Sequence, residues 1–165
     1  MCYSATFDGL MGLAQSGLSN QDVPTPVESM ALQGLIKEAI VSYKISRSAD
    51  GLNDGEITFG GLDPSKFDPN TLTTLPNKSP IGFWQADVDS ISVNGKDMGF
   101  PAGITAILDT GTSLVFGPRS NVTAIHNQIQ GSRVDDQAGF VVPCDLTESV
   151  ALTFGGQTCK SLILS

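Results

Sequence analysis

The chain has 165 residues, 40% hydrophobic and 16% charged, with a formal net charge of −8, and this length is enough to bury the core of one domain or slightly more. Its nine Lys and Arg are scattered along an acidic chain, which excludes nucleic acid as a partner because neutralising phosphates requires clustered cations. The sequence contains no run near the roughly 20 apolar residues of a membrane span and no C-x-x-C pair among its three Cys, so we expect no membrane partner, no metal site and no cofactor.

The composition favours a turn-rich β protein. The chain contains 18 Gly and 9 Pro with few charged residues, so we expect a mostly β fold with two or three short helices. The clearest helix start is at Thr25, which is predicted to be the N-cap, with Pro26 at the first helical position and Glu28 completing a capping box. Gly34 is predicted to end this helix.

The remaining elements are mostly strands. Strands are expected at residues 40–45, 56–59, 83–93, 100–108, 113–116, 140–142, 150–154 and in a final run to Leu164. Asn94-Gly95 favours a two-residue hairpin turn after the third of these strands. Val122, Ile125 and Ile129 stand at helical spacing, which predicts a short amphipathic helix that ends before Gly131.

The segment around Asp109 carries the strongest functional signal. Asp109 follows the apolar run 104–108, which we expect to lie inside a sheet, where a lone carboxylate is costly unless hydrogen bonds compensate. Gly111 permits a tight turn that brings backbone amides close to this carboxylate. The hydroxyls that can hydrogen-bond it or brace the turn are those of Thr110, Thr112 and Ser113. The segment is therefore predicted to be an anion site built around one aspartate.

A site of this kind suits an aspartyl dyad, in which two carboxylates about 3 Å apart share one proton. The ionised member activates water, and the protonated member polarises the carbonyl of the bond to be cut. Two alternatives remain open. One is an aspartate that only caps its own turn. The other is an aspartyl-phosphate site, although such sites carry a Lys directly after the Asp, where this chain has Thr110.

Several motifs together identify a family. The segments Phe7–Ala14, Ile57–Asp63, Phe83–Ile91 and Ala106–Pro118 resemble those of the pepsin-like aspartic proteases in sequence, order and spacing. Members of that family fold as two β-rich lobes, each of which gives one Asp-Thr-Gly aspartate to a dyad in the cleft between them. The resemblance implies a pepsin-like β-barrel lobe in which Asp109 is the catalytic aspartate of the second lobe. It also implies an aspartic-type endopeptidase that acts on peptide or protein substrates.

By this resemblance, the chain contains only part of the two-lobed family fold. Leu10-Met11-Gly12 is similar to the segment that crosses the Asp-Thr-Gly turn of the first lobe, whereas we find neither the first-lobe Asp-Thr-Gly nor the flap. Residues 1–20 are therefore expected to form the end of the first lobe, and residues 21–165 a second lobe truncated before its end. We expect the isolated chain to be inactive and to need the missing first lobe, or a second chain, to complete the dyad. The full-length protein is expected to be secreted or vacuolar, although this chain shows no signal peptide.

The resemblance also implies roles for further residues. Thr112 occupies a position that commonly contacts the substrate backbone. The positions that match side-chain pockets, unless they are plain core, are Phe7, Leu10, Phe83 and Ile107. Cys144 resembles a cysteine that the family pairs with a later one, so a disulfide between Cys144 and Cys159 is a possible pairing.

Two other features stand outside these motifs. Asn121-Val122-Thr123 fits the N-glycosylation pattern, as does Asn77-Lys78-Ser79, which Pro80 should weaken. The only histidine, His126, is predicted to face solvent on the second helix rather than to act as a catalytic base.

Two other functions remain as alternatives. A homodimer could form the dyad from two copies of Asp109, as in the one-lobe viral relatives. A non-catalytic β-rich domain could bind peptides with Asp109 in a purely structural role.

Overall fold

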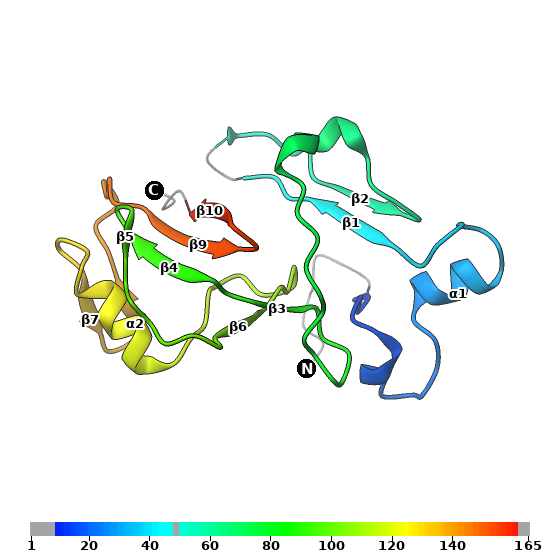
Figure 1. The fold of residues 1–165 in the computed structure, drawn as a ribbon, viewed down its shortest axis with the longest axis horizontal. Helices are drawn as coiled ribbons and strands as arrows, with labels where there is room; N and C mark the ends of the chain where they lie inside the picture. Colours follow the sequence, from blue (N-terminus) through cyan, green and yellow to red (C-terminus); the bar gives the residue numbers. More distant parts are fainter. Residues whose placement is uncertain (1–8, 48–49, 162–165) are drawn as a thin grey trace, which may run out of the picture.

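The structure, a computed structural model, describes residues 9–47 and 50–161 (Figure 1). Its α-helices are α1 (Pro26–Leu32) and α2 (Arg119–His126), and its 3-10 helices are η1 (Ser16–Leu18), η3 (Pro64–Lys66) and η4 (Pro69–Thr71). Its strands are β1 (Val41–Lys44), β2 (Glu56–Phe59), β3 (Gln85–Asp87), β4 (Ser90–Val93), β5 (Lys96–Asp97), β6 (Thr105–Ile107), β7 (Arg133–Asp135), β8 (Gly139–Val141), β9 (Val150–Phe154) and β10 (Gln157–Ser161). The predicted mostly β fold with short helices is confirmed.

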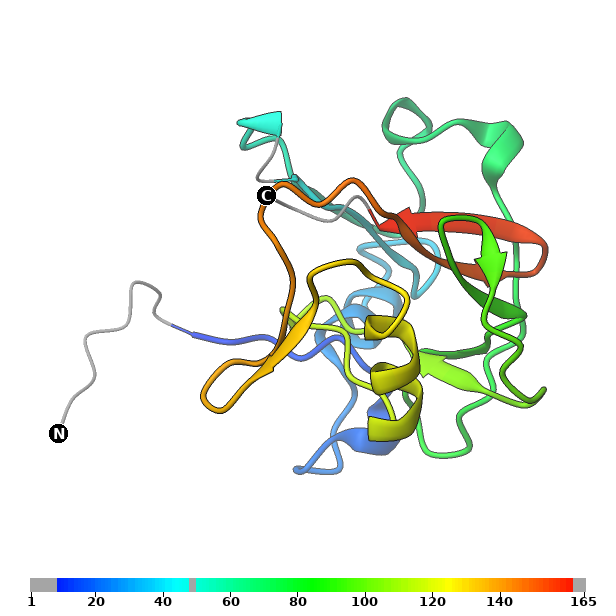
Figure 2. The ribbon, with the colours of Figure 1, turned by 90° about the vertical axis from the view of Figure 1, so that its left-hand side faces the viewer.

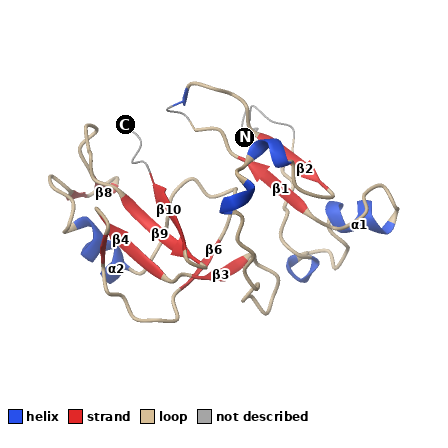
Figure 3. Cartoon of the chain, turned by 45° about the horizontal axis from the view of Figure 1, so that its top comes forward, coloured by secondary structure: helices blue, strands red, loops and turns tan. Residues whose placement is uncertain are grey.

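All strand pairs are antiparallel. A four-stranded sheet has the order β10-β9-β4-β5, and three two-stranded sheets pair β1 with β2, β3 with β6, and β7 with β8. The four-stranded sheet and α2 lie on one side of the molecule, and β1, β2 and α1 lie on the other (Figures 1 and 3). The β3–β6 pair lies between them. Among the described residues, no helix is long and apolar enough to cross a membrane.

Helix α1 begins as predicted. Thr25 Oγ1 accepts a hydrogen bond from Glu28 N at 3.2 Å, and Glu28 Oε2 accepts one from Thr25 N at 2.8 Å, so the capping box is complete. Gly34 follows the helix with a φ of +70°, which favours glycine because this backbone region is strained for other residues. Val27 anchors the helix in the small core.

The segment predicted as one strand over residues 83–93 is divided into β3 and β4. Val88 N donates to Ile104 O at 2.9 Å, whereas Asp89 N donates to Thr153 O at 2.8 Å, so the chain changes partner between these two residues. The predicted hairpin at Asn94-Gly95 is confirmed, with φ values of +52° and +77° that fit a type I′ turn.

The core is thin. Its buried hydrophobic residues are Val27, Ala86, Val88, Val93, Ile129 and Ala151. The accessible surface is 12296 Å², whereas a compact monomer of 17.3 kDa exposes about 7,800 Å². Much apolar surface therefore stays in contact with solvent, including Leu10 and residues 114–116.

Three sequence predictions need correction. Residues 113–116 form no strand, because no neighbouring segment pairs with them. The run 104–108 is not inside a sheet: β6 pairs only with β3, and Ile107 is 50% and Leu108 56% exposed. The strand expected over 100–108 is shortened to β6, since Gly103 turns the chain with a φ of +91°. The final strand, β10, matches the prediction as far as Ser161, and the rest of that run lies outside the described residues.

Candidate functional site

Asp109 is held by its own turn. Gly111 N donates a hydrogen bond to Asp109 Oδ1 at 2.8 Å, and Thr112 Oγ1 donates one to Asp109 Oδ2. A Cβ at residue 111 would lie 3.2 Å from Oδ1, so glycine gives the amide its close approach. Both hydrogen bonds match the sequence prediction that backbone amides of the turn and the Thr112 hydroxyl approach the Asp109 carboxylate. In the described part of the chain, the hydroxyls of Thr110 and Ser113 make no hydrogen bond to this carboxylate.

The turn favours the ionised form of Asp109. Its pKa is lowered, chiefly by the Thr112 hydroxyl and then by the Gly111 amide, since both donate to the charged carboxylate. The side chain is exposed, so the buried position that we expected is wrong. The reason is that β6 has only β3 as a neighbour, so the turn after β6, which contains Asp109, is open to solvent. No other carboxylate contributes to the pKa of Asp109 in the described part of the chain.

Strand β3 fixes the strand that leads into this turn. Gln85 pairs with Ile107 in the β3–β6 ladder, and Gln85 Nε2 donates to Thr105 Oγ1 at 2.6 Å. One residue before the ladder, Trp84 O accepts a hydrogen bond from Leu108 N at 2.8 Å. The position of Asp109 therefore depends on the backbone around residue 84.

The beginning of the described chain meets this same region. Trp84 Nε1 donates to Leu13 O at 2.8 Å, across 71 positions of sequence. Gln15 N donates to Gly82 O at 3.0 Å. Leu13 and Gln15 are thus held beside the strand pair that leads to Asp109.

Of the four predicted pocket residues, the three that the structure describes, Leu10, Phe83 and Ile107, line neither of the two pockets found among the described residues. Leu10 is 91% exposed, Ile107 is half exposed, and Phe83 is partly buried. Phe7 lies outside the described residues. Their role in binding a substrate therefore stays a prediction.

A groove of about 460 Å³ lies elsewhere, between the β1–β2 pair, the segment after β2 and the β9–β10 pair. Its apolar lining includes Tyr43, Leu62, Phe67, Leu75, Leu108 and Phe154. Leu108, one of these lining residues, directly precedes Asp109. Sequence reasoning missed this groove, because its walls come from segments far apart in the chain that no motif connects.

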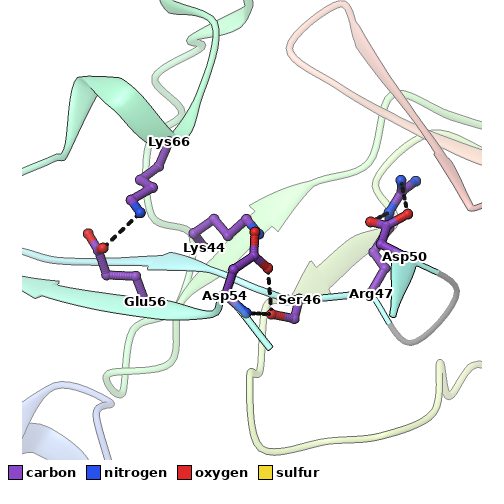
Figure 4. Close-up of polar contacts among 7 residues, drawn as sticks. All are labelled: Lys44, Ser46, Arg47, Asp50, Asp54, Glu56 and Lys66. Atoms are coloured by element: carbon purple, nitrogen blue, oxygen red, sulfur yellow. Dashed lines mark hydrogen bonds and ion pairs between the residues drawn. The ribbon is translucent and has the colours of Figure 1, made fainter. Parts of the chain in front are cut away.

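Three of the charged side chains that line this groove, those of Lys44, Glu56 and Lys66, are in ion pairs (Figure 4). Lys66 Nζ lies 3.0 Å from Glu56 Oε2, and Lys44 forms an ion pair with Asp54. Asp54 is also bonded to the Ser46 hydroxyl at 2.8 Å. Glu56 raises the pKa of Lys66, because its carboxylate stabilises the ammonium form. Since these charges satisfy one another, the groove offers mainly its apolar wall.

The possible disulfide is not formed. Cys144 and Cys159 are both free and exposed thiols. Cys159 lies on β10, opposite Leu152, whereas Cys144 follows β8 of a separate sheet.

His126 does not simply face solvent as predicted. Its ring stacks on Phe140 with centroids 4.5 Å apart, and its Nδ1 lies 2.8 Å from Ser132 Oγ (Figure 2 shows α2 beside the β7–β8 hairpin). Burial lowers its pKa, because desolvation disfavours the charged ring. The contact joins α2 to β8 and gives His126 a structural role.

The two glycosylation motifs lie in different surroundings. Asn121 is partly buried in the first turn of α2, and the Ser120 hydroxyl donates to its Oδ1 at 3.3 Å. Asn77 Oδ1 accepts from both Ser79 N and Gln85 N at 3.1 Å, so this side chain braces the approach to β3. Modification of Asn121 stays a prediction.

Metal ligands are not gathered anywhere in residues 9–47 and 50–161: no three His, Cys, Asp or Glu side chains stand close enough to hold an ion. The chemistry available at Asp109 is that of a single exposed carboxylate in its ionised form.

Comparison with known proteins gives concordant matches. The sequence model of the family described as eukaryotic aspartyl protease matches residues 1–162. The chain is 35% identical over 150 residues to aspartic-type endopeptidase ctsD of Aspergillus fumigatus, covering 90% of this chain and 31% of that protein. It is 36% identical over 146 residues to the pregnancy-associated glycoprotein of Equus caballus, covering 88% and 36%. It is 38% identical over 128 residues to napsin-A of Mus musculus, covering 77% and 30%. The chain thus spans about a third of the length of these relatives.

Proposed function

Because this chain belongs to the eukaryotic aspartyl protease family, a family of peptide hydrolases, we propose that it supplies one catalytic aspartate, Asp109, to an aspartic-type endopeptidase. The observation that supports this most is the self-contained turn. Gly111 and Thr112 hold both carboxylate oxygens and keep Asp109 ionised while leaving it exposed. Because Asp109 is exposed, a second carboxylate can approach it directly.

The reaction follows from placing a second carboxylate about 3 Å from Asp109. The two groups then share one proton and titrate as a pair. The ionised member takes a proton from a water molecule, whose oxygen bonds to the carbonyl carbon of the peptide. The protonated member donates its proton to the carbonyl oxygen. The resulting diol collapses as the carbon–nitrogen bond breaks, and a proton passes to the leaving nitrogen.

No second carboxylate among the described residues acts on the pKa of Asp109. The second carboxylate therefore has to come from outside the described residues. We assign residues 1–20 to the end of a first lobe and residues 21–165 to the second lobe. The apolar residues exposed beside the site, among them Ile107, Leu108 and Val115, give a surface that a covering lobe or a second chain would bury. The proposed full-length protein is a secreted or vacuolar protease that cuts extended peptides beside bulky apolar side chains.

Reconstitution tests this proposal. The 165-residue chain and a longer form that adds a first lobe with its own Asp-Thr-Gly are assayed at acidic pH with a protein substrate. The chain alone is expected to be inactive, and the longer form active and blocked by a peptide inhibitor that mimics the tetrahedral transition state. Activity of the chain alone as a monomer would contradict the proposal.

A homodimer with one aspartate from each chain is the second candidate, favoured by the same exposed apolar residues around β6. Analytical ultracentrifugation separates the two. A stable dimer that loses activity on Asp109→Asn supports the homodimer, and a monomer rules it out.

A further inference from the structure

Trp84 connects two parts of the chain that lie far apart in sequence. It is the only tryptophan. Its indole Nε1 donates to Leu13 O at 2.8 Å, and its main-chain oxygen accepts from Leu108 N at 2.8 Å. One peptide bond separates Leu108 from Asp109. The residue therefore joins the segment of Leu13 to the strand that carries the candidate catalytic aspartate.

We infer that Trp84 is a positioning residue, whose indole N–H holds the Leu10–Leu13 segment at a fixed place relative to Asp109. This inference rests on the proposed function, in which that segment belongs to the first lobe and Asp109 to the second. The Leu13–Trp84 hydrogen bond, which we call the indole link, then sets how the two lobes meet at the dyad.

Two glycines let the segments approach closely enough for this bond. A Cβ at Gly17 would lie 2.7 Å from Ile81 O, which cannot be accommodated without moving the backbone. Gly82 has a φ of +115°, and a Cβ there would lie 3.3 Å from the Cβ of Gln15. The Gln15–Gly82 main-chain hydrogen bond of 3.0 Å lies in the same contact. The indole link is thus part of a fitted contact rather than a chance surface bond.

The indole link can be removed without removing the main-chain bond that holds the Asp109 strand. Trp84 is 41% exposed, so it is not one of the buried core residues. The bond from Leu108 N uses the main-chain oxygen of Trp84, which every residue supplies. A change of side chain at this position therefore breaks the bond to Leu13 and keeps the bond that holds the Asp109 strand.

Amide hydrogen exchange on the 165-residue chain tests the link directly. In Trp84→Phe, exchange at Gln15 N–H is expected to speed up about fivefold or more, since losing a partly shielded hydrogen bond loosens the segment. Exchange at Leu108 N–H is expected to change less than twofold. Equal effects at both amides, or none at Gln15, would overturn the inference.

A conservative pair of replacements separates the N–H from the ring. Benzothienylalanine at position 84 keeps the shape of the indole but has sulfur in place of the N–H, whereas 7-azatryptophan keeps the N–H. The first is expected to behave as Trp84→Phe and the second as the unchanged chain. If benzothienylalanine left Gln15 protected, the hydrogen bond would have no positioning role.

Kinetics of the complete enzyme provide the functional readout. Trp84→Phe is expected to lower kcat about tenfold with little change in KM, because misplacing one aspartate weakens the transition state more than substrate binding. A raised KM with unchanged kcat would contradict a positioning role. If Asp109→Asn leaves proteolysis intact, the proposed function fails, while the exchange results still decide whether the link exists.

Discussion

The Thr112 hydroxyl donates its hydrogen bond to Oδ2 of Asp109, while the amide between them, that of Gly111, donates to Oδ1. Both carboxylate oxygens are thus held by Gly111 and Thr112, the second and third residues after Asp109 in the same turn. The geometry requires no contact from another element, so an exposed aspartate keeps a fixed orientation. A catalytic aspartate needs such a fixed orientation if a second carboxylate is to be placed beside it.

Removing the Thr112 hydroxyl should raise the pKa of Asp109. Thr112→Val deletes the largest cause of the lowered pKa, so the value should move up toward that of an ordinary aspartate. A carbon-13 NMR titration of the Asp109 carboxyl measures it. Thr110→Val is the control, because its hydroxyl makes no hydrogen bond to the carboxylate in the described structure. Equal shifts in the two variants would contradict this assignment.

Deleting the N-cap of α1 should destabilise the chain by about 1 kcal/mol. Thr25→Ala removes the acceptor for Glu28 N and loosens the reciprocal bond from Thr25 N. Urea unfolding measures the loss, which should appear as a lower midpoint with an unchanged slope. Thr74→Ala, at an exposed loop position, is the control and should change stability little. A midpoint unchanged by Thr25→Ala would refute the capping box as a stabilising contact.

His126 should make the fold less stable as the pH falls below about 6.5. Because burial lowers the folded-state pKa, the unfolded chain binds the proton first. The stabilisation that neutral His126 gives the fold is complete above its pKa in the unfolded chain. It declines as the pH falls toward the lower pKa of His126 in the folded chain. His126→Phe keeps an aromatic ring against Phe140 and should remove this dependence. Chemical unfolding between pH 5 and 8, in both variants, is the check, and parallel pH profiles would contradict it.

Cys144 and Cys159 should both react with a thiol reagent in the folded chain. Both are free and exposed, so alkylation without prior reduction should label each, as read by peptide mapping. A peptide pair linked through these two residues would show that the bridge forms after all.

Features set by near neighbours in sequence could be predicted from it. The capping box from Thr25 to Glu28, the type I′ turn at Asn94-Gly95 and the Asp109 turn each close within about four residues. Side-chain chemistry and backbone preference are enough to specify them. The candidate site belongs to this class, which is why its hydrogen bonds could be expected from Gly111 and Thr112.

Features that depend on what covers a segment could not be predicted. The apolar run before Asp109 reads as interior strand, yet β6 has only β3 as a neighbour and stays exposed. The stack of His126 on Phe140 and the link from Trp84 to Leu13 join segments that share no local pattern. Periodicity gives the face of an element but does not identify its partner.

The central claim is that Asp109 is catalytic, and one substitution tests it most directly. The full-length protein that contains this chain is assayed for peptide cleavage at acidic pH as wild type and as Asp109→Asn, which keeps the size of the side chain and removes its charge. The account predicts a loss of about a thousandfold or more in kcat, with the fold unchanged by circular dichroism. Cleavage within a few-fold of wild type would contradict it.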